Sequence, residues 1–564
     1  MMKSSIKALF AIVLFMLLPN MTFAQESIST YNLRINNTEL GSDNTEHLCF
    51  SWNINSDMRG FNQKAYQIEL SSNNKVIWNS GKINSSESIL VPYNGSQLNP
   101  ATKYTWKVKI WSENGETSEW SQQSNFTTGL FADKDWDGAK WIALEKDRKD
   151  WYVVPGIHSP LVKKHISDKD FGTYMLPKFK HSFTANKKIT RALAYICGLG
   201  QFELCINGNK IGDDFLDPGW TKYDKKALYV TFDVTKDIKE GNNEISISLG
   251  NGFYNIPRQG YFKWLGSFGA PKVRMLVRLE YADGKVKDII TDNTWKAAQS
   301  AITHSGIYSG EDYDATKEDM PWQKAIITSY NGLLESQKNP PVKIHEEIAV
   351  NRVFKNAKGN WVYDLGQNFS GIIRVKLEGR RGKTVTFRPA ELLNSDSTVN
   401  QSATGKYTLS YTLKGGEHEE WSPKFTYYGF RYVQLEDAVP QDKSNPDSLP
   451  VVENLMGLHT CSSAAEVGTF NCSNRLFNRT FELIDWAVRS NMQSLLTDCP
   501  HREKLGWLEE AHLMQYSMQY RYDLQMLYHK IMGDMEDSQT SNGNIPTIAP
   551  EYVHFDGGFE DTPE

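Results

Sequence analysis

Short alternating segments separated by turn residues make up most of the chain, and this pattern limits the possible folds more than any other feature. From about Ser27 to Ala464, branched and aromatic residues alternate with polar ones at a period of two, and Gly, Asn and Pro interrupt the runs. Helical spacing begins only at Ser473. A chain of 564 residues corresponds to about three to four domains. We therefore predict a multidomain, mainly β protein with a helical C-terminal part.

The first β region spans residues 25–130 and shows about seven strand-like runs, which is typical of a β-sandwich. Its pattern resembles a fibronectin type III domain. Trp52 and Trp106 fall at inward positions of the alternation and are expected in the core. The domain is interpreted as a spacer or packing partner, with ligand binding through exposed aromatic rings as the alternative.

The second β region, residues 135–335, is predicted to be a jelly roll. Asn207-Gly208 favours a tight hairpin, because both residues accept a positive φ. Asp217, Trp220, Asn251 and Tyr254 are candidates for a sugar-binding face, but turn chemistry and packing are the favoured explanation for these residues.

The third β region, residues 342–462, is predicted to be another sandwich. Asp364, Gln367 and Asn368 lie together at a Gly-containing turn, where such side chains often bind local backbone groups instead of a ligand.

Residues 465–564 carry the helical pattern. Ser473 or Asn474 can cap a first helix, and apolar residues then recur every three to four positions, which predicts one buried face; they are Leu476, Phe477, Phe481, Ile484, Ala487 and Val488. Two further helices are expected at residues 511–522 and 524–535, with Asp523 as the break between them.

Residues 1–24 have the layout of a secretory signal peptide: Lys3 and Lys7, an apolar run from Ala8 to Leu18, and Ala24 before the cleavage point. We therefore expect an exported protein, periplasmic or extracellular, with no membrane anchor.

The net charge of −5, without a basic stripe, argues against a nucleic-acid partner. The six Cys do not form a disulfide framework; Cys197 and Cys205 are candidates for a cross-strand pair, and isolated buried thiols are expected for most.

Polar and charged residues are densest in the stretch 498–510, which holds four carboxylates, one Arg, one His and one Trp. Pro500 and Gly506 interrupt helical periodicity, so the cluster is predicted on a turn beside the start of a helix. The simplest alternative is a solvated turn.

Glycoside hydrolysis needs two carboxyl groups, one to protonate the leaving oxygen and one to activate water or attack carbon. Glu503 and Glu510 are candidates, Arg502 can bind a carboxylate or a hydroxyl pair, and Trp507 would raise the pKa of a neighbouring carboxyl group. A metal site is the rival interpretation, using His501 with Asp498 and Cys499, or Glu510 with His512. No ligand spacing typical of zinc occurs, and no metal or other cofactor is predicted.

The stretch from Asp498 to Trp507, Asp-Cys-Pro-His-Arg-Glu-Lys-Leu-Gly-Trp, resembles the signature of the bacterial α-L-rhamnosidases of glycoside hydrolase family 78. Shorter matches occur at residues 217–220, 364–368, 390–393 and 425–432. The resemblance covers most of the chain after the signal peptide. It implies β-sandwich and jelly-roll domains followed by an (α/α)6 six-hairpin barrel, inverting chemistry without a metal, and release of terminal α-L-rhamnose from glycans or glycosides.

The resemblance also implies roles for individual residues. Glu503 takes the place of the general acid, Asp498 and Arg502 match positions that hold the rhamnose hydroxyls, and Trp507 matches an aromatic residue that lines the same pocket. Glu510 stands where many members have Asp, and Glu564 resembles a further sugar contact. The chain lacks one acidic residue that many members have between the Arg and the general acid.

In the family, the general base lies in later helices of the barrel. An (α/α)6 barrel needs about twelve helices of ~11–12 residues, and about a hundred residues follow Ala464. The expectation is therefore an incomplete barrel and an inactive fragment. Two alternatives stay open: a non-catalytic carbohydrate-binding protein, and a six-hairpin glycosidase of different sugar specificity. The sequence predicts no oligomeric state.

Overall fold

The computed structural model describes residues 28–36, 39–42, 48–153, 164–165, 167–257, 265–403 and 405–551. Strands dominate to residue 462 and α-helices follow, as predicted. The chain forms two compact units, one of residues 1–39 and 44–128, the other of residues 40–43 and 129–564. The predicted signal peptide and Glu564 lie outside the described residues. Among the residues described, no helix has both the length and the apolar character needed to cross a membrane.

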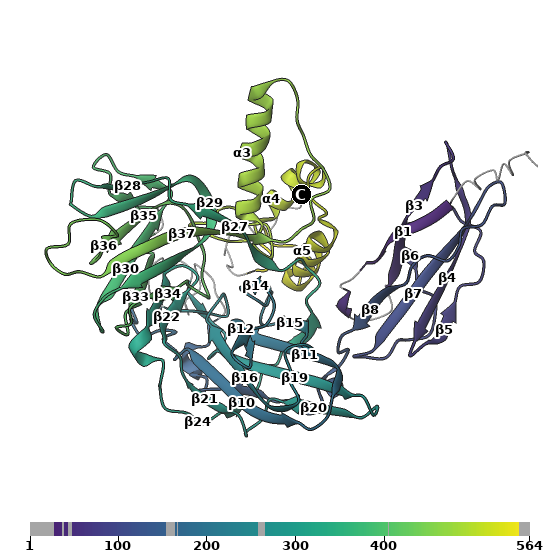
Figure 1. Cartoon of the computed structure of the whole chain (residues 1–564), viewed down its shortest axis with the longest axis horizontal. Helices are drawn as coiled ribbons and strands as arrows, with labels where there is room; N and C mark the ends of the chain where they lie inside the picture. Colours follow the sequence, from purple (N-terminus) through teal and green to yellow (C-terminus); the bar gives the residue numbers. More distant parts are fainter. Residues whose placement is uncertain are drawn as a thin grey trace, which may run out of the picture. The chain divides into compact units, whose positions relative to one another are not determined.

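The first unit is a β-sandwich (Figure 1). One sheet has the order β1 (Ile28–Ile35), β3 (Cys49–Ser56), β6 (Val91–Pro92); the other has the order β8 (Ser124–Thr128), β7 (Lys103–Ser112), β4 (Gln63–Ser72), β5 (Lys75–Asn79). Alternate residues of β7 point into the core. Trp52 and Trp106 are each 1% exposed, which confirms their predicted core positions.

The second unit begins with two packed sheets that correspond to the predicted jelly roll. The first sheet has the order β13 (Asn209–Lys210), β12 (Gln201–Ile206), β16 (Gly241–Gly250), β10 (Pro177–Ala185), β21 (Lys296–Gln299), β24 (Gln323–Lys324). The second has the order β25 (Ile326–Thr328), β9 (Trp141–Ala143), β19 (Lys272–Tyr281), β11 (Ile189–Leu199), β15 (Lys226–Asp233), β26 (Leu333–Ser336), with β20 (Val286–Ile290) on β19. Apolar side chains of both sheets share one core. Short accessory elements are β2 (Leu40–Ser42), the pair β17 (Asn255–Ile256) and β18 (Gly266–Ser267), and the 3-10 turns η1 (Asp133–Trp136), η2 (Lys149–Trp151) and η3 (Ala315–Lys317).

The predicted hairpin at Asn207-Gly208 is confirmed. The two residues have φ of 53° and 84°, and Ile206 pairs directly with Asn209. Positive φ at both turn positions gives the twist that flanking strands need.

The four candidates for a sugar-binding face are all buried. Trp220 stacks on Phe253 with ring centroids 3.8 Å apart, and the Asn251 side chain donates to the Ser305 carbonyl at 2.7 Å. Packing and turn chemistry therefore explain Asp217, Trp220, Asn251 and Tyr254.

The third β region is one large sheet built around β29 (Trp361–Glu378). Its main path is β14 (Asp214–Phe215), β27 (Val342–Ala349), β37 (Val451–Ser462), β29, β35 (Tyr428–Glu436), β30 (Thr384–Ala390), β33 (Thr408–Thr412), β23 (Gly310–Asp314), β22 (Ile302–Gly306). Strands β28 (Arg352–Lys355) and β34 (Glu419–Trp421) pair with β29, and β36 (Val439–Pro440) pairs with β37. A separate hairpin joins β31 (Leu392–Leu393) and β32 (Val399–Asn400).

Strand β29 belongs to two layers. Its first residues lie between β28 and β35, its last residues lie between β34 and β37, and the register shifts between Asp364 and Phe369. A strand that changes partners at such an irregularity can close a sheet over its own core. The apolar residues of this region form a single buried cluster, as expected for the predicted sandwich.

Residues 302–314 lie within the range of the second β region but pair with a strand of the third, and so link the two regions. They form β22 and β23, and β23 pairs in parallel with β33. The turn between β22 and β23 contains Ile307 and Tyr308, which contact the loop described below.

Three α-helices follow within residues 463–551, which the structure describes: α3 (Arg475–Asn491), α4 (Leu508–Gln519) and α5 (Gln525–Ser538) (Figure 1). The Asn474 side chain caps α3 by accepting from the Leu476 N–H, and Asp523 lies between α4 and α5 as predicted. Their shared core includes Val488, Leu496 and Leu527.

The predicted buried face of α3 is wrong for most of its length. Leu476 is 69% exposed and Phe477 58% exposed, and Ile484 is exposed as well. Among the residues described, packing against β29, β37 and the other helices buries only the C-terminal end of α3, around Val488. The periodicity was correct, but no described element covers the first turns.

All six cysteines are free thiols, and two of them, Cys197 and Cys461, are buried. The candidate pair Cys197 and Cys205 is not formed. Cys197 lies on β11 and Cys205 on β12, and these strands belong to different sheets.

Candidate active site

Residues 498–507 of the polar stretch lie in the loop between α3 and α4, and residues 508–510 begin α4. Residues 500–503 form a turn and α4 starts at Leu508, which confirms the predicted turn beside a helix start. Glu503 precedes the helix and Glu510 lies in its first turn. The two carboxylates are therefore not on the face of one continuous helix.

Hydrogen bonds across its base close the loop. The Asp498 N–H donates to the Leu505 carbonyl at 3.3 Å, and the Leu505 N–H donates to Asp498 Oδ1 at 3.2 Å. The Cys499 thiol donates to Asp498 Oδ2 at 2.8 Å, and the Glu503 N–H donates to Cys499 Sγ at 3.3 Å. Asp498 therefore holds the loop, although a carboxylate retains lone pairs for further donors.

Two donors contact the Glu503 carboxylate. The Trp507 indole N–H donates to Oε2 at 3.1 Å, and Arg502 Nη2 lies 3.5 Å from Oε1. The Glu503 side chain is mostly buried, whereas Arg502 is half-exposed. The structure thus brings together three of the predicted site residues, Arg502, Glu503 and Trp507.

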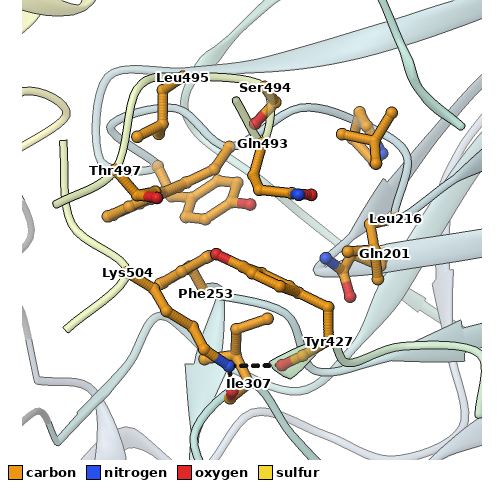
Figure 2. Close-up of a pocket in the computed structure, with 14 residues that line it drawn as sticks. Gln201, Leu216, Phe253, Ile307, Tyr427, Gln493, Ser494, Leu495, Thr497 and Lys504 are labelled. Atoms are coloured by element: carbon orange, nitrogen blue, oxygen red, sulfur yellow. Dashed lines mark hydrogen bonds between the residues drawn. The ribbon is translucent and has the colours of Figure 1, made fainter. Parts of the chain in front are cut away.

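Lys504 anchors the loop to the β regions. Its side chain is buried, and Nζ donates to the carbonyls of Ile307 and Tyr427, each at 2.6 Å (Figure 2). Nζ also lies 4.4 Å from the centroid of the Tyr427 ring, and burial lowers the pKa of Lys504 to about 7. The Tyr308 hydroxyl donates to the Glu503 carbonyl at 2.7 Å. Groups from two separate β segments therefore fix the backbone of residues 503 and 504.

Behind this anchor lies a small cavity of about 20 Å³, lined by residues that include Gln201, Phe253, Tyr427, Gln493 and Lys504 (Figure 2). A volume of this size holds about one water molecule. The cavity is a packing feature between the loop and the β regions, and it is too small for a sugar ring.

A short strand-like pairing positions Trp507 at the start of α4. The Ala549 N–H donates to the Gly506 carbonyl and the Leu508 N–H donates to the Thr547 carbonyl, both at 2.9 Å. A Cβ atom on Gly506 would lie 2.3 Å from the Ala549 carbonyl oxygen, so only glycine fits. Trp507 itself is the N-cap residue of α4.

Burial and neighbouring carboxylates raise the pKa values of Asp498 and Glu510. Burial raises the pKa of Asp498, and the nearby Glu503 raises it further. Burial also raises the pKa of Glu510, with added contributions from Asp498 and Glu509. Glu510 therefore lies close enough to Asp498 for their charges to interact, as expected for residues around one site.

The third β region supplies a further carboxylate. Glu391 follows β30, and its Oε2 lies 3.5 Å from Nδ1 of His501, while the Gly429 N–H at β35 donates to the Pro500 carbonyl at 3.1 Å. The sequence pattern predicts no role for Glu391, Tyr308 or Lys504. Glu391 lies in the family match at residues 390–393, which was the only signal for it; the contacts of Tyr308 and Lys504 arise from the tertiary fold.

Within the described part of the chain, no three His, Cys, Asp or Glu side chains are grouped to hold a metal ion. The proposed sugar contact Glu564 is outside that part, so its position stays a prediction.

Four protein-family models match the chain. They are a Rha78A-like N-terminal immunoglobulin domain at residues 31–132, the alpha-L-rhamnosidase N-terminal domain at 187–346, the bacterial alpha-L-rhamnosidase concanavalin-like domain at 354–454, and the bacterial alpha-L-rhamnosidase six-hairpin glycosidase domain at 465–564.

Individual proteins give the same picture. An alpha-L-rhamnosidase of Formosa agariphila is 33% identical over 539 residues, which cover 89% of this chain and 55% of that protein. The solved alpha-L-rhamnosidase of Dictyoglomus thermophilum has 34% identity and a TM-score of 0.81, over 93% of this chain and 59% of that one. The Streptomyces avermitilis alpha-L-rhamnosidase, solved with L-rhamnose, has 25% identity and a TM-score of 0.80, over 93% and 66%.

The chain spans a little over half the length of the Formosa relative. Domain matches in consecutive order, the relatives and the solved folds all agree with the motif at residues 498–507. The chain belongs to the α-L-rhamnosidases of glycoside hydrolase family 78.

Proposed function

We propose that the protein is an inverting glycoside hydrolase that releases terminal α-L-rhamnose from glycosides or oligosaccharides. The observation that carries the proposal is the geometry of Glu503, whose carboxylate lies between the Trp507 indole N–H and the Arg502 guanidinium on an anchored loop. Family membership supports rhamnose as the released sugar. It does not favour the alternative of a non-catalytic binding protein.

Glu503 is the general acid in this proposal. As the bond between the anomeric carbon and the leaving oxygen breaks, the Glu503 carboxyl group gives its proton to that oxygen. A water molecule attacks the anomeric carbon from the opposite face and loses a proton to a general base, which the family resemblance assigns to a later helix of the barrel. The product is β-L-rhamnose, because one displacement inverts the configuration.

The other residues bind and orient. Trp507 and Arg502 hold the Glu503 carboxylate, and Arg502, half-exposed, also presents guanidinium donors to sugar hydroxyls. Asp498 and Glu510 supply hydroxyl acceptors beside it. Glu564 is a proposed additional sugar contact.

The test uses the protein expressed from its complete reading frame, with an aryl α-L-rhamnoside as substrate. We expect turnover, release of the β anomer in an NMR time course, and a loss of roughly 10²- to 10⁴-fold in kcat for Glu503→Gln. A panel of other aryl glycosides tests the sugar. Turnover of another glycoside but not of the rhamnoside would contradict the proposed specificity, and full activity of Glu503→Gln would contradict the assigned acid.

We also propose that the protein is exported, to the periplasm or the medium. The layout of residues 1–24 supports this. N-terminal sequencing of the protein from cell fractions should find Gln25 as the first residue of the exported form. An uncleaved cytoplasmic protein would contradict the proposal.

A further inference from the structure

Three stretches of the third β region have no part in the reaction described above, yet their side chains form a continuous path to the catalytic loop. They are residues 364–368 on β29, Glu391 after β30 and Arg431 on β35. Each belongs to one of the sequence matches to the family. Because all three lead to the loop at residues 498–507, they are candidates for a shared function.

The path starts at the buried carboxylate of Asp364. Arg431 binds it with both ends of the guanidinium, Nε to Oδ1 at 2.8 Å and Nη2 to Oδ2 at 3.1 Å. Asp364 Oδ1 also accepts from the Gly366 N–H at 2.9 Å. These bonds fix the irregular segment of β29 that carries Asn368, so the direction of the Asn368 side chain is set by the sheet.

Asn368 in turn orients Glu391. Its side-chain amide donates to Glu391 Oε1 at 3.1 Å, which leaves Oε2 on the side of His501. Gly429 allows this arrangement, because a Cβ atom there would lie 2.6 Å from Pro500 Cγ and 3.0 Å from Glu391 Oε1. The Glu391 carboxylate therefore lies directly against the turn at residues 500–503.

The contact between Glu391 and His501 leaves both groups available. Burial lowers the pKa of His501, which disfavours its charged form and therefore an ion pair across the 3.5 Å contact. Among the described residues, Nδ1 of His501 is buried without a hydrogen-bond partner, and the side-chain donor to Glu391, Asn368, binds Oε1 and not Oε2. The two side chains are 24% and 25% exposed. Because Nδ1 of His501 is buried against Glu391, the imidazole can bind a hydroxyl group only through Nε2, and Glu391 Oε2 can accept a hydrogen bond from one.

We propose that Glu391, oriented by Asn368, binds together with His501 the hydroxyl groups of a sugar on the leaving-group side, so that the substrate is an α-L-rhamnosyl saccharide. The inference rests on the proposed function. His501 stands two residues before the acid Glu503, which must contact the oxygen that the leaving group carries. The proposal assigns the rhamnose to Asp498, Arg502 and Trp507. Glu391, which reaches the loop from the third β region, is therefore assigned to the sugar of the leaving group.

The experiment compares two substrates of the protein expressed from its complete reading frame: an aryl α-L-rhamnoside, whose leaving group lacks hydroxyl groups, and an α-L-rhamnosyl disaccharide. The readout is the ratio of kcat/KM for the disaccharide to kcat/KM for the aryl substrate. Glu391→Gln should lower this ratio roughly tenfold to a hundredfold, the range for a lost hydrogen bond to a charged group. Asn368→Ala, at an exposed position that folding tolerates, should lower it by roughly tenfold or less.

Glu347→Gln is the matched control, because Glu347 is an exposed carboxylate of the same sheet that pairs with Arg374 at 2.8 Å away from the loop. It should leave the ratio unchanged. A ratio that neither Glu391→Gln nor Asn368→Ala alters would overturn the inference, including the case in which both activities fall equally through a structural effect. A wild-type protein that hydrolyses neither rhamnoside would instead overturn the proposed function, and the inference with it.

Discussion

Glu503 depends on the indole N–H of Trp507, which donates to its carboxylate at 3.1 Å. Trp507→Phe keeps an aromatic ring and removes this donor. We expect kcat/KM for an aryl α-L-rhamnoside to fall roughly tenfold to a hundredfold, because a hydrogen bond to a charged group contributes about 1.5–3 kcal/mol. Trp120→Phe in the first unit removes an indole N–H elsewhere and should leave kcat/KM unchanged. Equal activities of both variants would show that the indole N–H does not act on Glu503.

Lys504 gives the protein a pH-dependent stability. Burial lowers its folded-state pKa to about 7, while the unfolded chain has a pKa near the ordinary value of about 10.4. Between these values the unfolded state binds more protons, so the free energy of unfolding rises as the pH increases. From pH 7 to pH 9 the rise should be about 2 kcal/mol.

Urea unfolding at pH 7, 8 and 9 gives the free energy of unfolding of the wild type and of Lys504→Met. The difference between the two proteins in how this free energy changes with pH measures the contribution of Lys504. The variant should lack the rise, and at pH 9 it should be less stable by about 2 kcal/mol, because the Ile307 and Tyr427 carbonyls lose their buried donor. Parallel pH dependences of the two proteins would contradict the assignment.

At the scale of elements, the pairing of residues 506–508 with 547–549 determines where α4 begins. Gly506→Ala would place Cβ 2.3 Å from the Ala549 carbonyl oxygen and force the two segments apart. We expect a loss of about 1–3 kcal/mol in stability, typical of overpacking, and a fall of at least about 10² in kcat, because Trp507 moves with the segment.

Gly416→Ala is the matched control, since a Cβ atom there meets nothing closer than 3.6 Å. It should behave as wild type in both thermal unfolding and turnover. A Gly506→Ala protein that keeps wild-type kcat would show that the strand-like pairing does not position the site.

Elements were predictable where a local rule decides the structure. The Asn207-Gly208 hairpin, the Asn474 cap and the break at Asp523 follow from backbone preferences of single residues, and the structure has all three. The turn at residues 500–503 was likewise predictable from Pro500 and Gly506. The grouping of strands was not: nothing local indicates that β23 pairs with β33, nearly a hundred residues away.

The site divides in the same way. Arg502, Glu503 and Trp507 come from one stretch, so a motif could identify them together. Tyr308 and Glu391 reach the loop from other strands, and their contacts depend on how whole sheets pack. The exposed face of α3 shows a limit of periodicity as a predictor. Periodicity identifies an apolar face of a helix, but not whether another element covers it.

At the scale of the whole molecule, this apolar face of α3 should drive self-association of the 564-residue chain. Leu476 and Phe477 are 69% and 58% exposed, and exposed apolar surfaces of this kind favour association. In sedimentation velocity the weight-average mass should rise with concentration, and Leu476→Gln with Phe477→Gln should reduce the rise. Glu482→Gln, a polar change on the same helix, is the control and should have no effect. A chain that stays monomeric at all concentrations would contradict this prediction.

The anchors of the loop at residues 498–507 also imply an order of events during synthesis. Ile307, Tyr308 and Tyr427, which bind residues 503 and 504, all precede that loop in the chain. Domains fold as units, N-terminal first, while the ribosome is still extending the polypeptide. The β regions that bind residues 503 and 504 can therefore fold before Glu503 is translated, and the loop can then pack against strands that are already folded.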